Sequence, residues 1–242
     1  RHIEAGTARD VEVRLERRKG PVPSTKNDTD VGGSEMIVYR VTPEDVTSGV
    51  TVGDLEYPGY PASGLAVAGV TIADPSVHVA FFALRYDQDV NAPMRLFARD
   101  AAGNSATAEF DHRTFPKQFK SSRIPIDDKF LDRVVPAIME GTTEVKAAGS
   151  TIDSFLVING ELRRRNGARI ASFAAQTAPE MLWGGAVFHQ FSNTAVESAF
   201  ADRRTYLYQG RDVDKQTHLG FDLASFANTP IVAANRGRVA LA

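Results

Sequence analysis

The spacing of apolar residues changes twice along this chain, and this change constrains the fold more than any other feature. In the first 115 residues apolar and polar side chains alternate, as at Val11 and Val13, and a period of two is typical of half-buried strands. From about residue 116 the spacing becomes helical, with Phe130, Val134 and Ile138 on one stripe. Strand-like runs return from about residue 186. The sequence therefore predicts a mainly β protein with a helical connector, an α+β arrangement.

Residues 1–115 are predicted to form a β-sandwich, because short strands are separated by turn signals. Residues 77–84 are mostly apolar and fit a strand buried on both faces. Two further runs, 94–99 and 106–111, flank Asp100-Ala-Ala-Gly-Asn104, where Gly103 and Asn104 are expected to take positive φ angles. This hairpin resembles the closing hairpin of bacterial immunoglobulin-like domains. We therefore expect an immunoglobulin-like sandwich.

Residues 116–185 are predicted to be a helical connector. Asp127 precedes the first apolar stripe and is the expected N-cap. Pro136 is expected to kink or shorten this helix. Residues 141–149 are a predicted linker, and a second helix is expected from about Ile152 to Ala174.

Composition excludes several classes of protein. Lys and Arg total 28 and Asp and Glu total 30, for a net charge of −2, which argues against a dedicated nucleic-acid binder. The Arg163-Arg-Arg165 run is therefore expected on a solvated helix face or in ion pairs.

No cysteine is present, so any metal site must use His, Asp or Glu. No apolar run reaches the roughly 20 residues that cross a bilayer. The chain starts at Arg1 without a signal peptide, and an upstream segment, including a membrane anchor, is an expectation.

His218 and Asp222 are the candidate metal ligands. They are four residues apart and would share one face of a strand or a helix. Gly220 and the neighbouring β pattern favour a strand. Imidazole and carboxylate both bind Zn²⁺, but a catalytic zinc usually has three protein ligands. The alternative is a surface histidine beside an aspartate that caps a turn.

Other residues near this pair have two possible interpretations each. Tyr206 and Tyr208 share one strand face and are candidates for a substrate groove, with core packing as the alternative. His189 is a further candidate for substrate binding. The neighbouring charges of Asp202, Arg203 and Arg204 are expected on the surface.

The residues around the candidate ligands carry a family resemblance. Thr217-His-Leu-Gly-Phe-Asp-Leu-Ala224, with Asn228-Thr-Pro-Ile-Val-Ala-Ala-Asn-Arg-Gly-Arg-Val239, resembles the first half of the LytM/lysostaphin-type zinc metallopeptidase domain, family M23. Upstream segments look like a bacterial envelope branch of that family with a long N-terminal region; these are residues 31–36, 122–124, 130–136, 159–166 and 200–206. On this resemblance, residues 186–242 are the N-terminal part of the peptidase domain.

The resemblance implies a peptidoglycan endopeptidase of the periplasm or the extracellular cell envelope. In that family the counterparts of His218 and Asp222 bind zinc, and a later His-x-His motif supplies a third ligand and a catalytic histidine. This chain contains no His-x-His motif. The expected partner is a peptide of peptidoglycan, and no oligomeric state is implied. The alternative function is that of an inactive LytM-like protein that regulates an enzyme or binds the cell wall. A further hypothesis is that the helical region, from about Lys117 to Ala178, restricts access to the zinc site.

Overall fold

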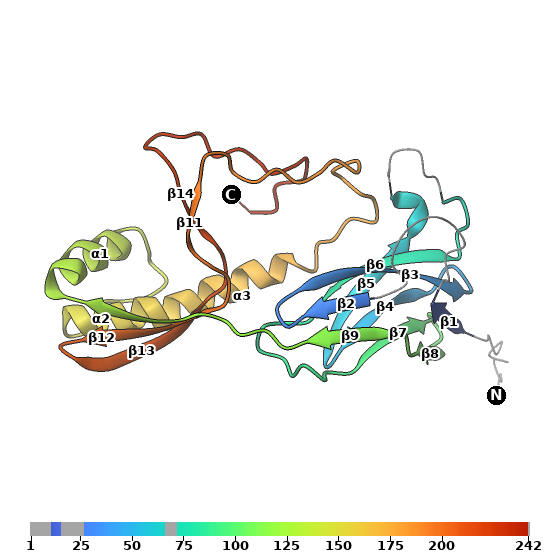
Figure 1. The fold of residues 1–242 in the computed structure, drawn as a ribbon, viewed down its shortest axis with the longest axis horizontal. Helices are drawn as coiled ribbons and strands as arrows, with labels where there is room; N and C mark the ends of the chain where they lie inside the picture. Colours follow the sequence, from blue (N-terminus) through green and yellow to red (C-terminus); the bar gives the residue numbers. More distant parts are fainter. Residues whose placement is uncertain (1–10, 16–26, 66–71, 242) are drawn as a thin grey trace, which may run out of the picture. The chain divides into compact units, whose positions relative to one another are not determined.

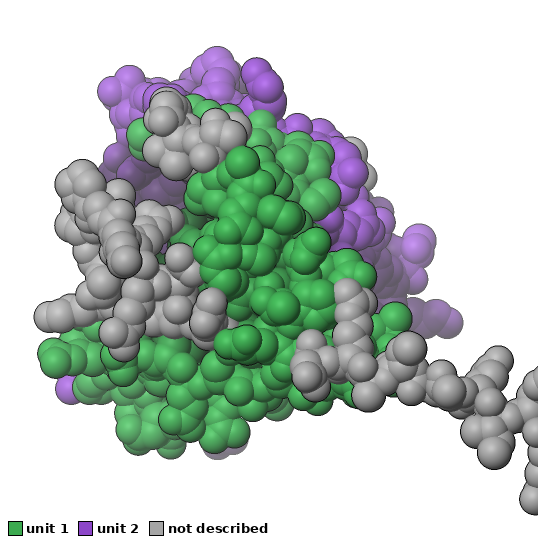
Figure 2. Space-filling model, turned by 90° about the vertical axis from the view of Figure 1, so that its right-hand side faces the viewer, with its two compact units in different colours: residues 1–117, 178–187 green, residues 118–177, 188–242 purple. Residues whose placement is uncertain are grey.

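The chain divides into two compact units in the computed structural model, which describes residues 11–15, 27–65 and 72–241. Unit 1 comprises residues 1–117 and 178–187, and unit 2 comprises residues 118–177 and 188–242 (Figure 2). Parts of the predicted sandwich, at 1–10, 16–26 and 66–71, lie outside the described residues. Strands predominate in the rest, which confirms a mainly β protein that also contains helices. None of the described helices is long and apolar enough to span a membrane.

Unit 1 is built on one seven-stranded antiparallel sheet in the order β1-β3-β6-β5-β4-β7-β8. The first and last strands of this order contact each other, so the sheet is nearly closed into a barrel. Its strands are β1 (Glu12–Leu15), β3 (Ser34–Thr42), β4 (Thr47–Val52), β5 (Leu55–Pro61), β6 (Val77–Ala83), β7 (Met94–Arg99) and β8 (Ser105–Ala108). A parallel pair accompanies it, formed by β2 (Asn27–Asp30) and β9 (His112–Phe115). Within residues 36–65 and 72–110 the only helical turn is 3-10 helix η1 (Ala62–Gly64), which agrees with the prediction that this region consists of strands.

Strand β5 is where the structure departs from the predicted pair of separate sheets. Its first half pairs with β4 and its second half, from Gly59, pairs with β6, so the strands form one continuous sheet. Gly59 also lies against the ring of Tyr39: a Cβ atom there would lie 1.8 Å from Tyr39 Oη. A glycine is needed at this point because two backbones and a buried aromatic side chain converge.

The Asp100–Asn104 turn forms the predicted hairpin between β7 and β8. Gly103 has a φ of +91°, as expected. Asn104 has no positive φ; instead its side chain donates a hydrogen bond to Asp100 Oδ2 at 2.8 Å. The turn is therefore held by an aspartate that accepts bonds from the residues after it.

Unit 2 combines a three-stranded sheet with two helical segments (Figure 1). The sheet has the order β10-β12-β13, where β10 (Ser121–Ile126) is parallel to β12 (Asp202–Tyr208) and β12 is antiparallel to β13 (Arg211–His218). Helix α1 is Asp128–Glu140, and a continuous helical run follows as α2 (Thr151–Val157), the π-helical turn η2 (Ile158–Leu162) and α3 (Arg163–Phe173). A small antiparallel pair consists of β11 (Ala195–Ser198) and β14 (Asp222–Ala224).

Helix α1 begins and ends close to its predicted limits. The side chain of Asp127 accepts a hydrogen bond from the Phe130 N–H at 2.8 Å, so the predicted N-cap is confirmed. Pro136 lies inside the helix but does not shorten it, because the helix continues to Glu140. The carbonyl that Pro136 leaves without a partner belongs to Asp132. Both residues are exposed, so water can solvate that carbonyl.

The predicted connector is not a separate helical piece. The start of the predicted connector is strand β10, which was not predicted from the sequence and which belongs to the same sheet as β12. The helices then pack on that sheet through one core, formed by Ile126, Leu131, Val135, Phe155, Ile158, Leu162 and Tyr206. The arginine run at 163–165 lies on α3, where Arg165 pairs with Glu161, consistent with ion pairing. The helices and the later strands therefore share one folded unit.

Candidate metal site

Two antiparallel ladders of unit 2 form one bent hairpin. In the register, Asp202 is opposite His218, and Ser198 is opposite Asp222, with three residues on each strand between the two pairs. Ala201 marks the bend: its φ is +61°, and its N–H donates to the His218 carbonyl at 2.7 Å. Figure 1 shows β11 and β14 continuing away from β12 and β13 at this point. Such irregular points in a ladder redirect side chains, which is why they often occur at functional sites.

His218 and Asp222 meet at this bend. The structure places His218 at the end of β13 and Asp222 at the start of β14, so the prediction that they lie on a single strand is wrong. The chain leaves one sheet at residues 219–221 and enters the other. The side chains nevertheless face each other, with His218 Nε2 3.4 Å from Asp222 Oδ1.

The His218 ring is in an unusual state for a buried polar group. Its Nε2 atom is buried and has no hydrogen-bond partner among the described residues, whereas buried polar atoms are nearly always satisfied. The 3.4 Å contact with Asp222 is longer than the roughly 2.7–2.9 Å of a charge-assisted hydrogen bond. Nitrogen and carboxylate oxygen therefore face each other without a bond between them.

That separation fits a shared zinc ion. Zn–N and Zn–O bonds are about 2.0–2.2 Å long, so two ligands on a tetrahedral ion lie about 3.3–3.5 Å apart. The observed 3.4 Å falls in this interval. In the part of the chain that the structure describes, no group of three or more His, Asp or Glu side chains could hold a metal ion. The described residues thus supply two ligands of a possible site.

A polar network extends from Asp222 into the sheet. Arg204 Nη2 donates to Asp222 Oδ2 at 3.0 Å and to Ser198 Oγ at 2.6 Å. Arg204 Nε lies 3.5 Å from Asp202 Oδ2. The hydroxyl of Ser122, on β10, lies 2.9 Å from both carboxylate oxygens of Asp202. With His218, these residues form what we call the bend cluster: Ser122, Ser198, Asp202, Arg204, His218 and Asp222.

The charges of the bend cluster are arranged around a partly buried arginine. The side chain of Arg204 is 16% exposed and that of Asp202 is 3% exposed, whereas that of Asp222 is 54% exposed. Burial on its own would lower the pKa of Arg204, but its hydrogen bonds to Asp222, Tyr206 and Asp202 produce a net rise. With His218 neutral, two carboxylates and one guanidinium give the cluster a formal charge of −1, which suits a cation.

Sequence reasoning placed Asp202 and Arg204 on the surface, and the structure corrects this. Along β12, Asp202 and Tyr206 are buried, Arg204 is partly buried, and Arg203 is exposed. Residues two apart share a face of a strand, so the buried tyrosine was a signal that its neighbours at 202 and 204 face inward. Only Arg203 lies where the sequence analysis expected it.

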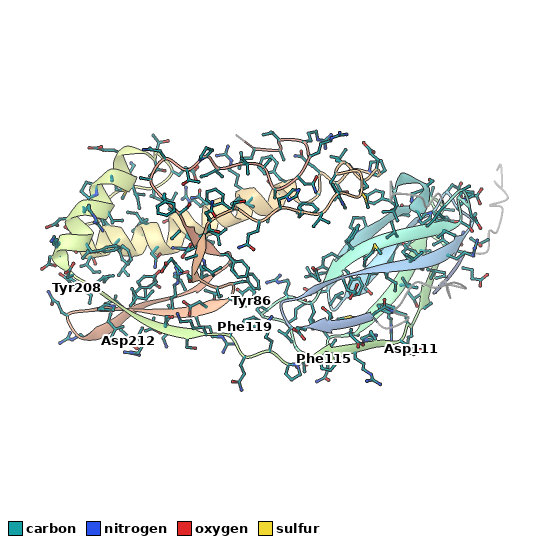
Figure 3. The ribbon with its side chains drawn as sticks, turned by 45° about the horizontal axis from the view of Figure 1, so that its top comes forward. Tyr86, Asp111, Phe115, Phe119, Tyr208 and Asp212 are labelled. Atoms are coloured by element: carbon teal, nitrogen blue, oxygen red, sulfur yellow. The ribbon has the colours of Figure 1, made fainter. Side chains whose placement is uncertain are left out.

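The three residues predicted to bind substrate have other surroundings. Tyr206 is buried in the helix–sheet core, where its ring packs edge to face on Phe155 at 5.7 Å. Tyr208 lies beside the start of α1 (Figure 3), and its hydroxyl donates to Asp128 Oδ1 at 2.6 Å. His189 is exposed in an irregular segment, where its N–H donates to the Ala234 carbonyl. Tyr206 is therefore a core residue, whose side chain also hydrogen-bonds Arg204, and Tyr208 is hydrogen-bonded to α1.

Comparisons with known proteins establish no family for this chain. No protein-family model matches it, and no curated protein matches it. One similar solved structure is that of Rst D1-D2, at 14% identity and a TM-score of 0.24, covering 48% of this chain and 58% of that one. The chain thus spans little more than half of that protein, and a likeness this weak establishes neither fold nor function.

Proposed function

We propose that this chain is part of an M23-like zinc metalloendopeptidase that hydrolyses peptide cross-links of bacterial peptidoglycan. The observation that carries the proposal is the buried Nε2 atom of His218, which has no described hydrogen-bond partner and faces Asp222 Oδ1 at a distance that suits two ligands of one zinc ion. These two residues lie in the segment that resembles the family, where their counterparts bind zinc.

In this proposal each ligand has a defined task. His218, held by its backbone contact with Ala201, would present the Nε2 lone pair. Asp222 presents one oxygen, because its other oxygen is engaged by Arg204. A bound zinc ion would supply a bound water of lowered pKa and polarise the scissile carbonyl. On the resemblance, a third ligand and the catalytic histidine would come from a later His-x-His motif.

The proposal extends to the rest of the protein. A peptidoglycan substrate would place the enzyme in the periplasm or the extracellular envelope, with a membrane anchor upstream of Arg1 as one arrangement. Unit 1, whose antiparallel strands form a nearly closed sheet, would be an immunoglobulin-like domain that holds the enzyme within the cell wall. A peptidoglycan endopeptidase has no need to bind nucleic acid, and the net charge of −2 agrees with that.

A second candidate is supported by the ligand count. Because no group of three metal-binding side chains occurs in the described part of the chain, a protein without the His-x-His motif would have the scaffold but an incomplete zinc site. Such a protein would bind the cell wall or regulate another enzyme without hydrolysing peptidoglycan.

One assay separates these functions. The full-length protein is incubated with purified peptidoglycan, with zinc or with a chelator, beside His218→Ala and the control His112→Ala, a unit 1 histidine. The enzyme proposal predicts release of soluble peptides by the unchanged protein and the control, and loss of release with chelator or with His218→Ala. Binding to peptidoglycan without release by any form would support the second candidate and contradict the first.

A further inference from the structure

We propose that Arg204 is a positioning residue for the candidate zinc ligands His218 and Asp222. Arg204 holds Asp222 so that a single carboxylate oxygen faces His218. This inference rests on the proposed function, because it assigns a role to a residue that does not itself touch the metal. Residues that hydrogen-bond to metal ligands orient those ligands in metal sites generally, and the bend cluster contains the contacts that such a role requires.

The first contact is with the ligand itself. Arg204 Nη2 is 3.0 Å from Asp222 Oδ2, while Asp222 Oδ1 lies 3.4 Å from His218 Nε2. One carboxylate oxygen is therefore occupied by the guanidinium and the other faces the imidazole. Because the Asp222 side chain is 54% exposed, packing alone does not restrain its rotation. The arginine supplies the restraint.

The arginine is in turn held from behind. Its Nη2 donates to Ser198 at 2.6 Å, and its Nε faces the buried Asp202, whose carboxylate lies within 2.9 Å of the Ser122 hydroxyl. These anchors come from β10, β11 and β12. The arginine is thereby fixed by three strands, and the position of Asp222 is tied to the sheet.

Asp202 has an electrostatic task as well. A guanidinium next to a metal site would repel the cation, and the repulsion is strong where water is excluded. The carboxylate of Asp202, 3% exposed and 3.5 Å from Arg204 Nε, balances that charge. The pair therefore orients Asp222 without adding net positive charge.

The test measures zinc affinity in the full-length protein by competition with a chromophoric chelator. Arg204→Gln is expected to weaken zinc binding by about 10–100-fold. The control is Arg203→Gln, the next residue on β12, which is exposed and is expected to bind zinc as the unchanged protein does. Asp202→Asn, which is nearly isosteric, is expected to weaken binding as well, because it leaves the arginine charge unbalanced.

Two further readouts separate positioning from general destabilisation. The thermal midpoint is measured with chelator present, and the visible spectrum is recorded with Co²⁺ in place of zinc. Positioning predicts weaker zinc binding and an altered Co²⁺ spectrum for Arg204→Gln even where the metal-free midpoint is close to that of the unchanged protein. Arg204→Lys should recover affinity only in part, because an ammonium lacks the planar fork that reaches both carboxylates.

The outcomes distinguish failure of the Arg204 positioning role from failure of the proposed zinc-dependent function. If the unchanged protein binds no zinc, the proposed function fails and this inference fails with it. If the unchanged protein binds zinc and Arg204→Gln binds it equally tightly or more tightly, the positioning role alone is overturned.

Discussion

At the scale of single residues, the core of unit 1 contains three buried polar side chains in contact, those of Tyr39, Ser48 and His78. Ser48 Oγ lies 2.8 Å from both Tyr39 Oη and His78 Nδ1. Burial raises the pKa of Tyr39 to about 12 and lowers the pKa of His78 from 6.5. The folded state thus favours the neutral form of both groups. A network of this kind makes the stability of unit 1 depend on pH.

We predict that the free energy of unfolding of unit 1 falls as the pH drops below about 6.5. The unfolded histidine takes up a proton there, whereas the folded His78, with its lower pKa, stays neutral until a lower pH. Urea unfolding between pH 5.2 and 7.5 measures the slope. His78→Gln should flatten it, whatever its effect at pH 7.5. An equal slope in both proteins would show that His78 is not the titrating group.

Gly59→Ala is predicted to destabilise unit 1 by about 1–3 kcal/mol, as overpacked cores do. Its new Cβ would lie 1.8 Å from Tyr39 Oη, and that ring is fully buried and hydrogen-bonded to Ser48. Chemical denaturation measures the change. The matched control is Gly167→Ala on α3, where a Cβ has nothing within 4 Å and helix propensity favours alanine. Equal stability of Gly59→Ala and the unchanged protein would contradict this account of the contact.

The sequence was sufficient to identify His218 and Asp222 as a possible pair but not their supporting residues. Four-residue spacing predicted a shared face, and the side chains do meet, although across a bend that the spacing did not reveal. Arg204 was assigned to the surface because charged residues usually lie there. Its burial depends on Asp202 and on Ser122, and these two residues are 80 positions apart in the sequence. Local pattern carries no information on such a contact.

At the element scale, helix limits were more predictable than strand partners. Asp127 identified the start of α1 because an N-cap is a local signal. Strand β10 was missed because it has only six residues, one of them Pro125, and because α1 and the continuous helical run α2–η2–α3 separate it from its partner β12. Parallel pairing of this kind depends on long-range packing.

We predict that Leu131→Ala on α1 lowers the stability of unit 2 by about 2–5 kcal/mol, as large-to-small core changes do. Leu131 is 1% exposed and lies in the core shared with Tyr206 of β12. Hydrogen exchange should therefore speed up at the β12 amides as well as in α1. Ile170→Ala is the control, because Ile170 is 64% exposed on α3. Faster exchange confined to α1 would contradict a common core.

At the scale of the whole molecule, the helices are a structural layer of unit 2. The hypothesis that they gate the zinc site treats them as a removable cover, yet β10 and the helices contribute Ile126, Leu131 and Phe155 to the core that buries Tyr206. A protein that begins near Asn193 would expose that core. The change between strand and helix periods was visible in the sequence. That the helices and the later strands belong to one folded unit was not.

We therefore predict that a truncated protein beginning at Asn193 does not fold. Its circular dichroism spectrum should lack a cooperative thermal transition, because it would keep only Tyr206 of the seven buried core side chains. A version beginning at Gln118, the first residue of unit 2, is the control and should retain such a transition. A folded protein from Asn193 onward would restore the removable-cover hypothesis.

The central claim, that His218 and Asp222 bind one zinc ion, is tested most directly by anomalous diffraction at the zinc absorption edge, from crystals of the full-length protein grown with zinc. We predict an anomalous peak about 2.0–2.2 Å from both His218 Nε2 and Asp222 Oδ1, with Asp222 Oδ2 still on Arg204. Zinc bound elsewhere, with Nε2 hydrogen-bonded directly to Asp222, would contradict the claim.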